Sequence, residues 1–191
     1  MASERSPTDA ESMFLGCPSR QRNYARAVGA WRCAPATTSS AERALRRVDP
    51  AEERGDTRRA MSRENVELVR RMWEAFLAND FQTALSSYDP DVEWDGTNLP
   101  DGQIGRGLDA IMDHITRWSD MWESWNVEVE EVIDAGPDYV VVFIRETGRS
   151  SSGLDMDERH GELYTVRAGR IVRRQGFSDP NEALEAVGLR E

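Results

Sequence analysis

The chain has 191 residues, of which 39% are hydrophobic and 31% charged, and its formal net charge is −11. This size and composition are typical of one soluble globular core with room for an extension. The acidic balance disfavours binding to nucleic-acid phosphates, and the sequence holds no apolar run of about 18 residues that could span a membrane. The two cysteines, Cys17 and Cys33, lie near the N-terminus, so we expect the remainder to suit a reducing cytoplasm.

The first 60 residues differ from the rest of the chain. They hold 11 Arg and 8 acidic residues, whereas residues 61–191 hold 13 Arg and 27 acidic residues. Their apolar residues are scattered, so the segment buries too little apolar surface to offset the entropy of ordering it. We predict a disordered extension over residues 1–60 and one domain over residues 61–191. The extension is either a genuine tail or the product of a start codon placed upstream of a natural start at Met61.

Helical periodicity dominates the first half of this domain. Apolar residues recur at intervals of three and four from Val66 to Leu77, directly after Ser62, a suitable N-cap. The same spacing recurs further on, and Pro90 stops the second stretch. The predicted helices span about 62–78, 81–87 and 108–124.

From Trp125 the apolar period changes to two, which is typical of strands. The predicted strands run from Trp125 to a turn at 134–138, then over 139–147, 157–167 and 171–177, after a short strand at 92–94. A last helix is predicted over 180–187, and residues 96–107 are predicted to form a loop. Strands that follow helices, rather than alternate with them, indicate an α+β fold with helices on one face of a curved antiparallel sheet.

Several short stretches carry a family resemblance. They are Glu74-Ala75-Phe76, Tyr88–Trp94, Gly105-Arg106-Gly107, the hairpin Tyr164–Val172 and the ending Glu182–Leu189. In order and spacing, over about residues 61–191, they resemble the NTF2-like superfamily and its SnoaL-like group, which is related to polyketide cyclase and ketosteroid isomerase. The resemblance implies a cone-shaped, curved antiparallel sheet wrapped around helices, an NTF2-like α+β barrel, that encloses a pocket. It also implies homodimers formed through the outer sheet face.

Two carboxylates are the candidate catalytic groups. By position, Asp95 resembles the general-base aspartate of ketosteroid isomerase, and Glu162 lies where the resemblance places a second acid. A carboxyl in an apolar pocket has a raised pKa and can move protons. The alternative for Asp95 is a solvated residue at the start of the loop, or a cap of Gly96. Glu162 stands where a histidine is expected in many SnoaL-like relatives.

Further residues are expected to line the pocket. His160, Glu162 and Tyr164 alternate along one strand and therefore share a face. The resemblance places Arg174 inside the cone, where it needs a carboxylate partner; the alternative is a solvated arginine on an edge strand.

Aromatic residues and a histidine complete the expected pocket. Trp73 aligns with the oxyanion-hole tyrosine of the isomerase but offers only an N–H donor. We expect Trp73 in the pocket wall or the core. His114 and Trp118 lie one turn apart on the third predicted helix, with Trp94 upstream, and are expected to line the pocket.

No motif for a cofactor or a metal occurs in the sequence. The glycines of the 96–107 loop match neither a dinucleotide-binding nor a Walker pattern, and the two histidines lack the spacing of a metal site. We expect no cofactor, no metal and a small-molecule ligand. Two functions stay open: a cofactor-independent isomerase, cyclase or hydrolase that uses Asp95 as a base on a small apolar substrate, and a non-catalytic ligand-binding or dimerisation module.

Overall fold

The computed structural model describes residues 50–100 and 102–189, which belong to one compact unit. The predictions for residues 1–49, including those that concern Cys17 and Cys33, lie outside the described residues. The elements in chain order are α2 (Pro50–Leu77), α3 (Phe81–Ser86), β1 (Tyr88–Asn98), β2 (Ile104–Arg106), α4 (Leu108–Asp120), β3 (Ser124–Asp134), β4 (Tyr139–Arg149), β5 (Asp155–Arg167), β6 (Arg170–Phe177) and α5 (Pro180–Glu185).

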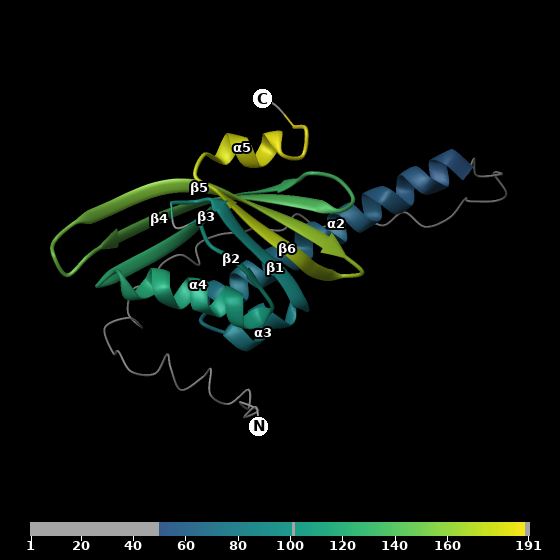
Figure 1. Cartoon of the computed structure of the whole chain (residues 1–191). Helices are drawn as coiled ribbons and strands as arrows, with labels where there is room; N and C mark the ends of the chain where they lie inside the picture. Colours follow the sequence, from purple (N-terminus) through teal and green to yellow (C-terminus); the bar gives the residue numbers. More distant parts are fainter. Residues whose placement is uncertain (1–49, 101, 190–191) are drawn as a thin grey trace, which may run out of the picture. The chain divides into compact units, whose positions relative to one another are not determined.

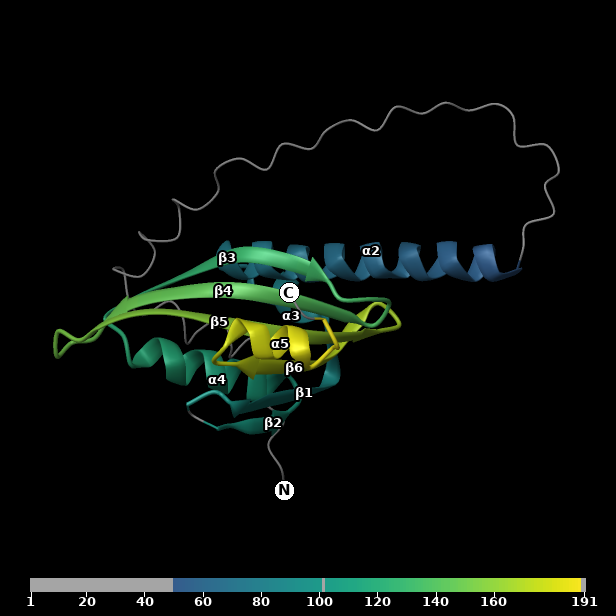
Figure 2. The same cartoon turned by 90° about the horizontal axis from the view of Figure 1, so that it is seen from above.

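The strands form one six-stranded sheet in the order β2-β1-β6-β5-β4-β3. Neighbouring strands are antiparallel except β1 and β6, which run parallel. The sheet is curved and does not close on itself, with α4 below it and α5 above it in Figure 1, and Figure 2 shows the long α2 alongside β3. The α+β prediction and the curved sheet are confirmed.

Two apolar clusters lie on opposite faces of the sheet. The larger one joins α2 and α4 to the inner face, where Val140, Val142 and Ile144 of β4 are fully buried. The smaller one joins α5 to the outer face through Val141, Phe143, Leu163, Phe177, Ala183 and Leu184. Gly161 permits this close approach, since a Cβ there would lie 2.9 Å from the Cβ of Ala183.

Helix α2 begins at Pro50, upstream of the predicted start at Ser62, so residues 50–60 are helical and not part of a disordered extension as predicted. Ser62 does not cap the helix: its hydroxyl donates to the Asp134 carboxylate and lies 3.2 Å from the Gly136 carbonyl oxygen. One turn later, the Asn65 side chain donates to the Pro137 carbonyl oxygen at 2.7 Å. The two polar side chains therefore fasten α2 to the β3–β4 turn. The earlier part of α2 escaped prediction because its described side chains, residues 56–61, are all exposed and form no apolar stripe.

The region after α3 also differs from the prediction. Strand β1 covers Tyr88–Asn98 instead of residues 92–94, and β2 falls inside the predicted 96–107 loop. Both differences arise from pairing: β1 bonds to β2 on one side and β6 on the other. The remaining helices and strands occur where the apolar periodicity predicts them, with ends that shift by a few residues. Within the described residues, no helix is long and apolar enough to cross a membrane.

Candidate functional site

A cavity of about 60 Å³ opens on the inner side of the sheet. Its walls come from the loop after β1, from α4, and from the inner faces of β4, β5 and β6; they comprise Leu99, Pro100, His114, Trp118, Glu146, Glu158, His160, Glu162, Arg174 and Ser178. Pro100, Glu158 and Ser178 are exposed, so they mark the mouth. The cavity therefore reaches from solvent to buried charged groups.

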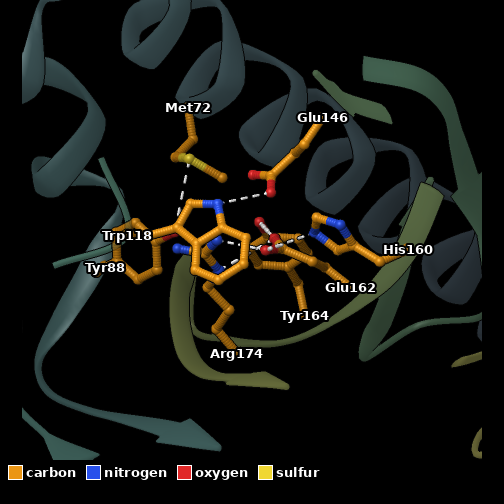
Figure 3. Close-up of polar contacts among 8 residues, drawn as sticks. All are labelled: Met72, Tyr88, Trp118, Glu146, His160, Glu162, Tyr164 and Arg174. Carbon is orange, nitrogen blue, oxygen red and sulfur yellow. Dashed lines mark hydrogen bonds and ion pairs between the residues drawn. The ribbon is translucent and has the colours of Figure 1, made fainter. Parts of the chain in front are cut away.

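Glu162 on β5 is the centre of the polar network at the cavity floor (Figure 3). The guanidinium of Arg174 donates to both carboxylate oxygens, with 3.0 Å between Nε and Oε2. The Tyr164 hydroxyl donates to the same carboxylate. All three side chains are buried, and they meet because Tyr164 pairs with Arg174 across β5 and β6.

These partners fix the charge of Glu162. Burial by itself would raise the pKa of the carboxyl, but the positive charge and hydrogen bonds of Arg174, together with the nearby His160, lower that pKa to about 2. Glu162 is therefore ionised at neutral pH and saturated with donors. Such a carboxylate orients its neighbours, and it is a poor proton acceptor.

His160 lies two residues before Glu162 on the same face of β5. Its Nε2 is 3.9 Å from Oε1 of Glu162, and its side chain is 14% exposed. Burial lowers the pKa of His160, but the interaction with Glu162 and the negative charge of Glu146 outweigh this, so the net pKa is raised. The imidazole therefore keeps its proton to a higher pH than an unperturbed histidine does.

Glu146 on β4 is a partly buried acid of the cavity wall that was not predicted from the sequence. The indole N–H of Trp118 donates to its Oε2 at 2.9 Å, the one hydrogen bond that the described residues give this carboxyl. Burial raises its pKa. The sequence predicts residues 139–147 as a continuous apolar strand and does not assign its side chains to the two faces of the sheet. Glu146 could have been placed on the inner face, because alternate residues of a strand share a face and Val142 and Ile144 face the core.

The aromatic residues predicted for the pocket surround Arg174. The rings of Trp94 and His114 stack with 4.3 Å between centroids. The guanidinium carbon of Arg174 lies 4.9 Å from the centroid of Trp94 and 5.9 Å from that of Trp73. These contacts hold the arginine between two indoles, where cation–π attraction adds to its ion pair with Glu162.

A second cavity of about 20 Å³ adjoins the first. Both share His114, Trp118, Glu146 and Arg174 as lining residues. Trp73, Phe76, Ile115, Trp125 and Val127 complete its walls. We call this the inner cavity, because its own walls are apolar or aromatic side chains of α2, α4 and β3.

Asp95 lies apart from this site, contrary to the expectation that it serves the pocket as a base. Its neighbour Trp94 pairs with Arg174 on the inner side, so Asp95 shares the outer face with Arg173 and Gln175. Its Oδ2 accepts from Arg173 at 2.6 Å and from Gln175 at 3.3 Å. Burial tends to raise the pKa of Asp95, but hydrogen bonds from Thr97 and Arg173 lower it. Successive residues of a strand lie on opposite faces of the sheet, so Asp95 and its neighbour Trp94 face opposite sides.

The arrangement can transfer protons and stabilise a charge. It brings His114, Trp118, His160, Glu162 and Arg174 to one cavity and adds Glu146. Tyr164 donates a hydrogen bond to Glu162, and Trp73 and Trp94 flank Arg174. Among the residues that the structure describes, no group of three or more His, Cys, Asp and Glu side chains is arranged to hold a metal ion.

Solved structures share this fold. TerC co-crystallised with polyporic acid has a TM-score of 0.54 and 23% identity, over 65% of this chain and 98% of that chain. An NTF2-like protein of unknown function from Burkholderia pseudomallei has a TM-score of 0.53 and 22% identity, over 65% of this chain and 98% of that chain. A candidate polyketide cyclase from Xanthomonas campestris has a TM-score of 0.51 and 18% identity, over 67% and 99% of the two chains. At these identities the likeness shows the fold alone.

A family model supports the same assignment at the level of sequence. No curated protein matches the chain. The model described as the SnoaL-like domain matches residues 69–174, from the middle of α2 to the arginine of the cavity floor. This match spans more than half of the sequence and includes every residue that lines the cavity except Ser178, so the chain belongs to the SnoaL-like domain family.

Proposed function

We propose that this chain binds a small molecule in the cavity and catalyses a proton transfer on it without a cofactor, with Glu146 as the acid–base group. The observation that carries the proposal is the setting of Glu146: a partly buried carboxyl with a raised pKa that lines the cavity and receives one hydrogen bond, from Trp118. A general acid–base group works best when its pKa approaches the working pH. Glu162, held ionised by Arg174, does not meet that condition.

The proposed step is the removal of a proton from a carbon next to a carbonyl group. The carboxylate of Glu146 takes the proton, and the C–H electron pair moves toward the carbonyl oxygen, which gains negative charge. The Trp118 N–H stabilises the carboxylate form of Glu146, and His160, whose pKa is raised, stabilises the new negative charge when its imidazole is protonated. Return of the proton to the same or another carbon completes an isomerisation or prepares a ring closure.

The cavity limits the size of the ligand. A water needs about 10–15 Å³ of such volume, so the main cavity of about 60 Å³ has room for a few water-sized groups. We therefore propose a small molecule, or the reactive end of a larger one whose remainder leaves through the mouth at Pro100 and Ser178.

Deuterium exchange tests the proposal with a defined probe. Cyclopentanone in D2O is followed by proton NMR, and the wild-type chain is expected to accelerate loss of the protons next to the carbonyl. The Glu146→Gln variant keeps an acceptor for Trp118 but cannot take the proton, so exchange should fall by about 10²–10⁴-fold. Asp95→Asn is the matched control and should exchange at the wild-type rate. Equal rates for wild type and Glu146→Gln would remove Glu146 from the reaction.

A non-catalytic ligand-binding module is the second candidate. Two features favour it: Trp73 stands where a titratable phenol would serve catalysis, and Glu162 is saturated by its ion pair. This candidate predicts that cyclopentanone binds, as judged by tryptophan fluorescence, while its exchange rate stays at the uncatalysed level.

We also propose a homodimer through the part of the outer sheet face that α5 leaves uncovered. There β3, β4 and β5 carry paired charges: Arg159 with Glu130, and Arg145 with Asp157 at 2.7 Å. A surface with both signs of charge can complement itself across a twofold axis. Sedimentation of the wild type and of Arg159→Glu tests this, and an unchanged mass for the variant would contradict it.

We also propose a cytoplasmic location, since residues 61–191 contain no cysteine.

A further inference from the structure

Leu99, in the loop after β1, stands over the inner face of β6. A Cβ added at Gly176 would lie 2.8 Å from Cγ of Leu99 and closer still to its Cδ1, which is nearer than carbon atoms pack. Gly176 is buried and follows Arg174 by two residues, so the two share the inner face of the strand. Leu99 is partly buried and lines the main cavity. The absent side chain of Gly176 therefore lets Leu99 rest directly on the sheet inside the cavity.

This position lies between the two ends of the cavity. Arg174 belongs to the cavity floor and Ser178, just after β6, to the mouth, and Gly176 is midway between them along the chain. Across the sheet, Gly176 pairs with Glu162. A ligand that enters beside Ser178 therefore passes the Leu99 side chain before it reaches the charged groups of the floor.

Hydrogen bonds hold this part of the loop in place. The backbone N–H of Leu99 donates to the Gly96 carbonyl oxygen at 2.8 Å. The carbonyl oxygen of Asn98 accepts from the backbone N–H of Ser178 at 3.1 Å and from the Ser178 hydroxyl at 2.8 Å. The loop is thus tied to the end of β6, and Leu99 forms a fixed wall.

We propose that Leu99 determines the shape of the ligand: it narrows the path from the mouth to the floor, so that the cavity accepts carbonyl compounds with slim, unbranched substituents and excludes branched ones. We call this narrow point the Leu99 constriction. The inference rests on the proposed function, because it takes the ligand to be a small carbonyl compound that enters through the mouth. One carbon atom too many in a fitted apolar pocket changes selectivity by about 10–200-fold, so a branch beside Leu99 has a measurable cost.

A matched pair of isomers tests the constriction in the full-length chain. The probes are cyclopentanones that carry a propyl or an isopropyl group on the same ring carbon, so they differ in width and not in composition. Binding is followed by tryptophan fluorescence. The wild type is expected to prefer the propyl isomer by about tenfold or more. Leu99→Ala removes an isopropyl group from the wall and should reduce this preference to less than about threefold.

Two further variants control the comparison. Leu85→Ala truncates a leucine that packs against the same core but lines neither cavity, so it should keep the wild-type preference. Gly176→Ala adds the Cβ under Leu99 and should weaken binding of the propyl isomer by about tenfold. The φ of Gly176 is not positive, so the backbone accepts alanine.

The double variant Leu99→Ala/Gly176→Ala isolates the contact between the two residues. The shortened side chain no longer meets the added Cβ, so the double variant should bind the propyl isomer as tightly as Leu99→Ala does. Weaker binding that persists in the double variant would overturn the assignment of this contact to Leu99.

The outcomes separate this inference from the proposed function. Equal affinity of the wild type for the two isomers, or the same preference in Leu99→Ala, overturns the constriction, while the proton-transfer proposal stands on its exchange assay. Failure of both isomers to bind overturns the constriction as well. Wild-type exchange in Glu146→Gln, together with a preference that Leu99→Ala abolishes, would instead remove the proposed catalysis and keep the constriction.

Discussion

Glu146, which is partly buried, and Glu162, which is buried, lie on the same face of the sheet, yet their pKa values move in opposite directions. Burial raises the pKa of Glu146, and the positive charges of His160 and Arg174 offset only part of that rise. Glu162 is buried as well, but Arg174 and the donors around it bring its pKa to about 2. Environments that separate the pKa values of neighbouring acids are typical of sites that divide one acid–base task between them.

Loss of the Glu162 charge should be costly for the fold. In Glu162→Gln, Arg174 stays buried without its counter-ion, and we expect a loss of about 3–5 kcal/mol in the free energy of unfolding, measured by urea denaturation. Asp157→Asn is the control, because its ion pair with Arg145 is about half exposed and should matter far less. Comparable losses in the two variants would contradict the central position assigned to Glu162.

The two acids should also give opposite dependences of stability on pH. The pKa of Glu162 falls from 4.5 in the unfolded chain to about 2 in the fold, so its stabilisation is complete above pH 4.5 and is lost as the pH falls toward 2. The pKa of Glu146 is raised above 4.5, so its ionisation opposes folding as the pH rises through that value.

Melting temperatures across pH measure both effects. Glu162→Gln should flatten the rise in stability between about pH 2 and pH 4.5. Glu146→Gln should instead make the protein less sensitive to pH above 4.5 and more stable at neutral pH. A wild-type pH profile for either variant would contradict the pKa shift assigned to that acid.

For single residues, the sequence predicts best which side chains share a face of one strand, because alternate residues of a strand point to the same side. His160, Glu162 and Tyr164 could be placed on one face from their alternation, and the structure puts them there. The face of Asp95 could not be read in this way, because it depends on the register between β1 and β6, which are distant in the sequence. The inner cavity was equally out of reach, since Trp73 and Trp125 meet only through tertiary packing.

At the scale of single elements, the β5–β6 hairpin contains an unfavourable residue. Ala168 has a φ of 50° and Gly169 a φ of 73°, so both residues of the turn are left-handed. Glycine adopts this conformation freely, whereas alanine adopts it at a cost that asparagine largely avoids. We expect Ala168→Asn to raise the free energy of unfolding by about 0.5–1 kcal/mol. Chemical denaturation measures this, and a lower stability would contradict the turn geometry.

Apolar periodicity predicted most elements, because a helix stripe or an alternating strand must bury one side. It did not predict the elements that form through strand pairing or that consist of exposed, polar residues. Strand β2 has only three residues and none of them is buried, so no pattern announces it. The start of α2 likewise has no apolar pattern in the sequence, since its described side chains before Ser62 face solvent.

At the scale of the whole molecule, helix α2 divides into two parts. The described side chains from Asp56 to Met61 are exposed, while the contacts with the β3–β4 turn begin at Ser62 and Asn65. A chain that starts at Met61 should therefore keep its melting temperature within a few degrees and its affinity for cyclopentanone.

A chain that starts at Glu67 provides the comparison. It loses the hydrogen bonds of Ser62 and Asn65 to residues 134–137 and should melt at a clearly lower temperature. Equal stability of the two shortened chains would show that these bonds do not secure the helix, and a large loss in the chain from Met61 would give residues 1–60 a structural role.

The parallel contact between β1 and β6 has a kinetic consequence. Every other strand pair joins neighbours in the sequence, but this one joins residues 88–98 to residues 171–177 and must close a long loop before it gains any bonds. The same contact brings Trp94 over Arg174. We therefore expect the β3–β6 meander to form early and the ligand-binding wall to be completed in the last, slowest step of folding. Nascent or partly refolded chains would then be unable to hold a ligand until the final strand has docked.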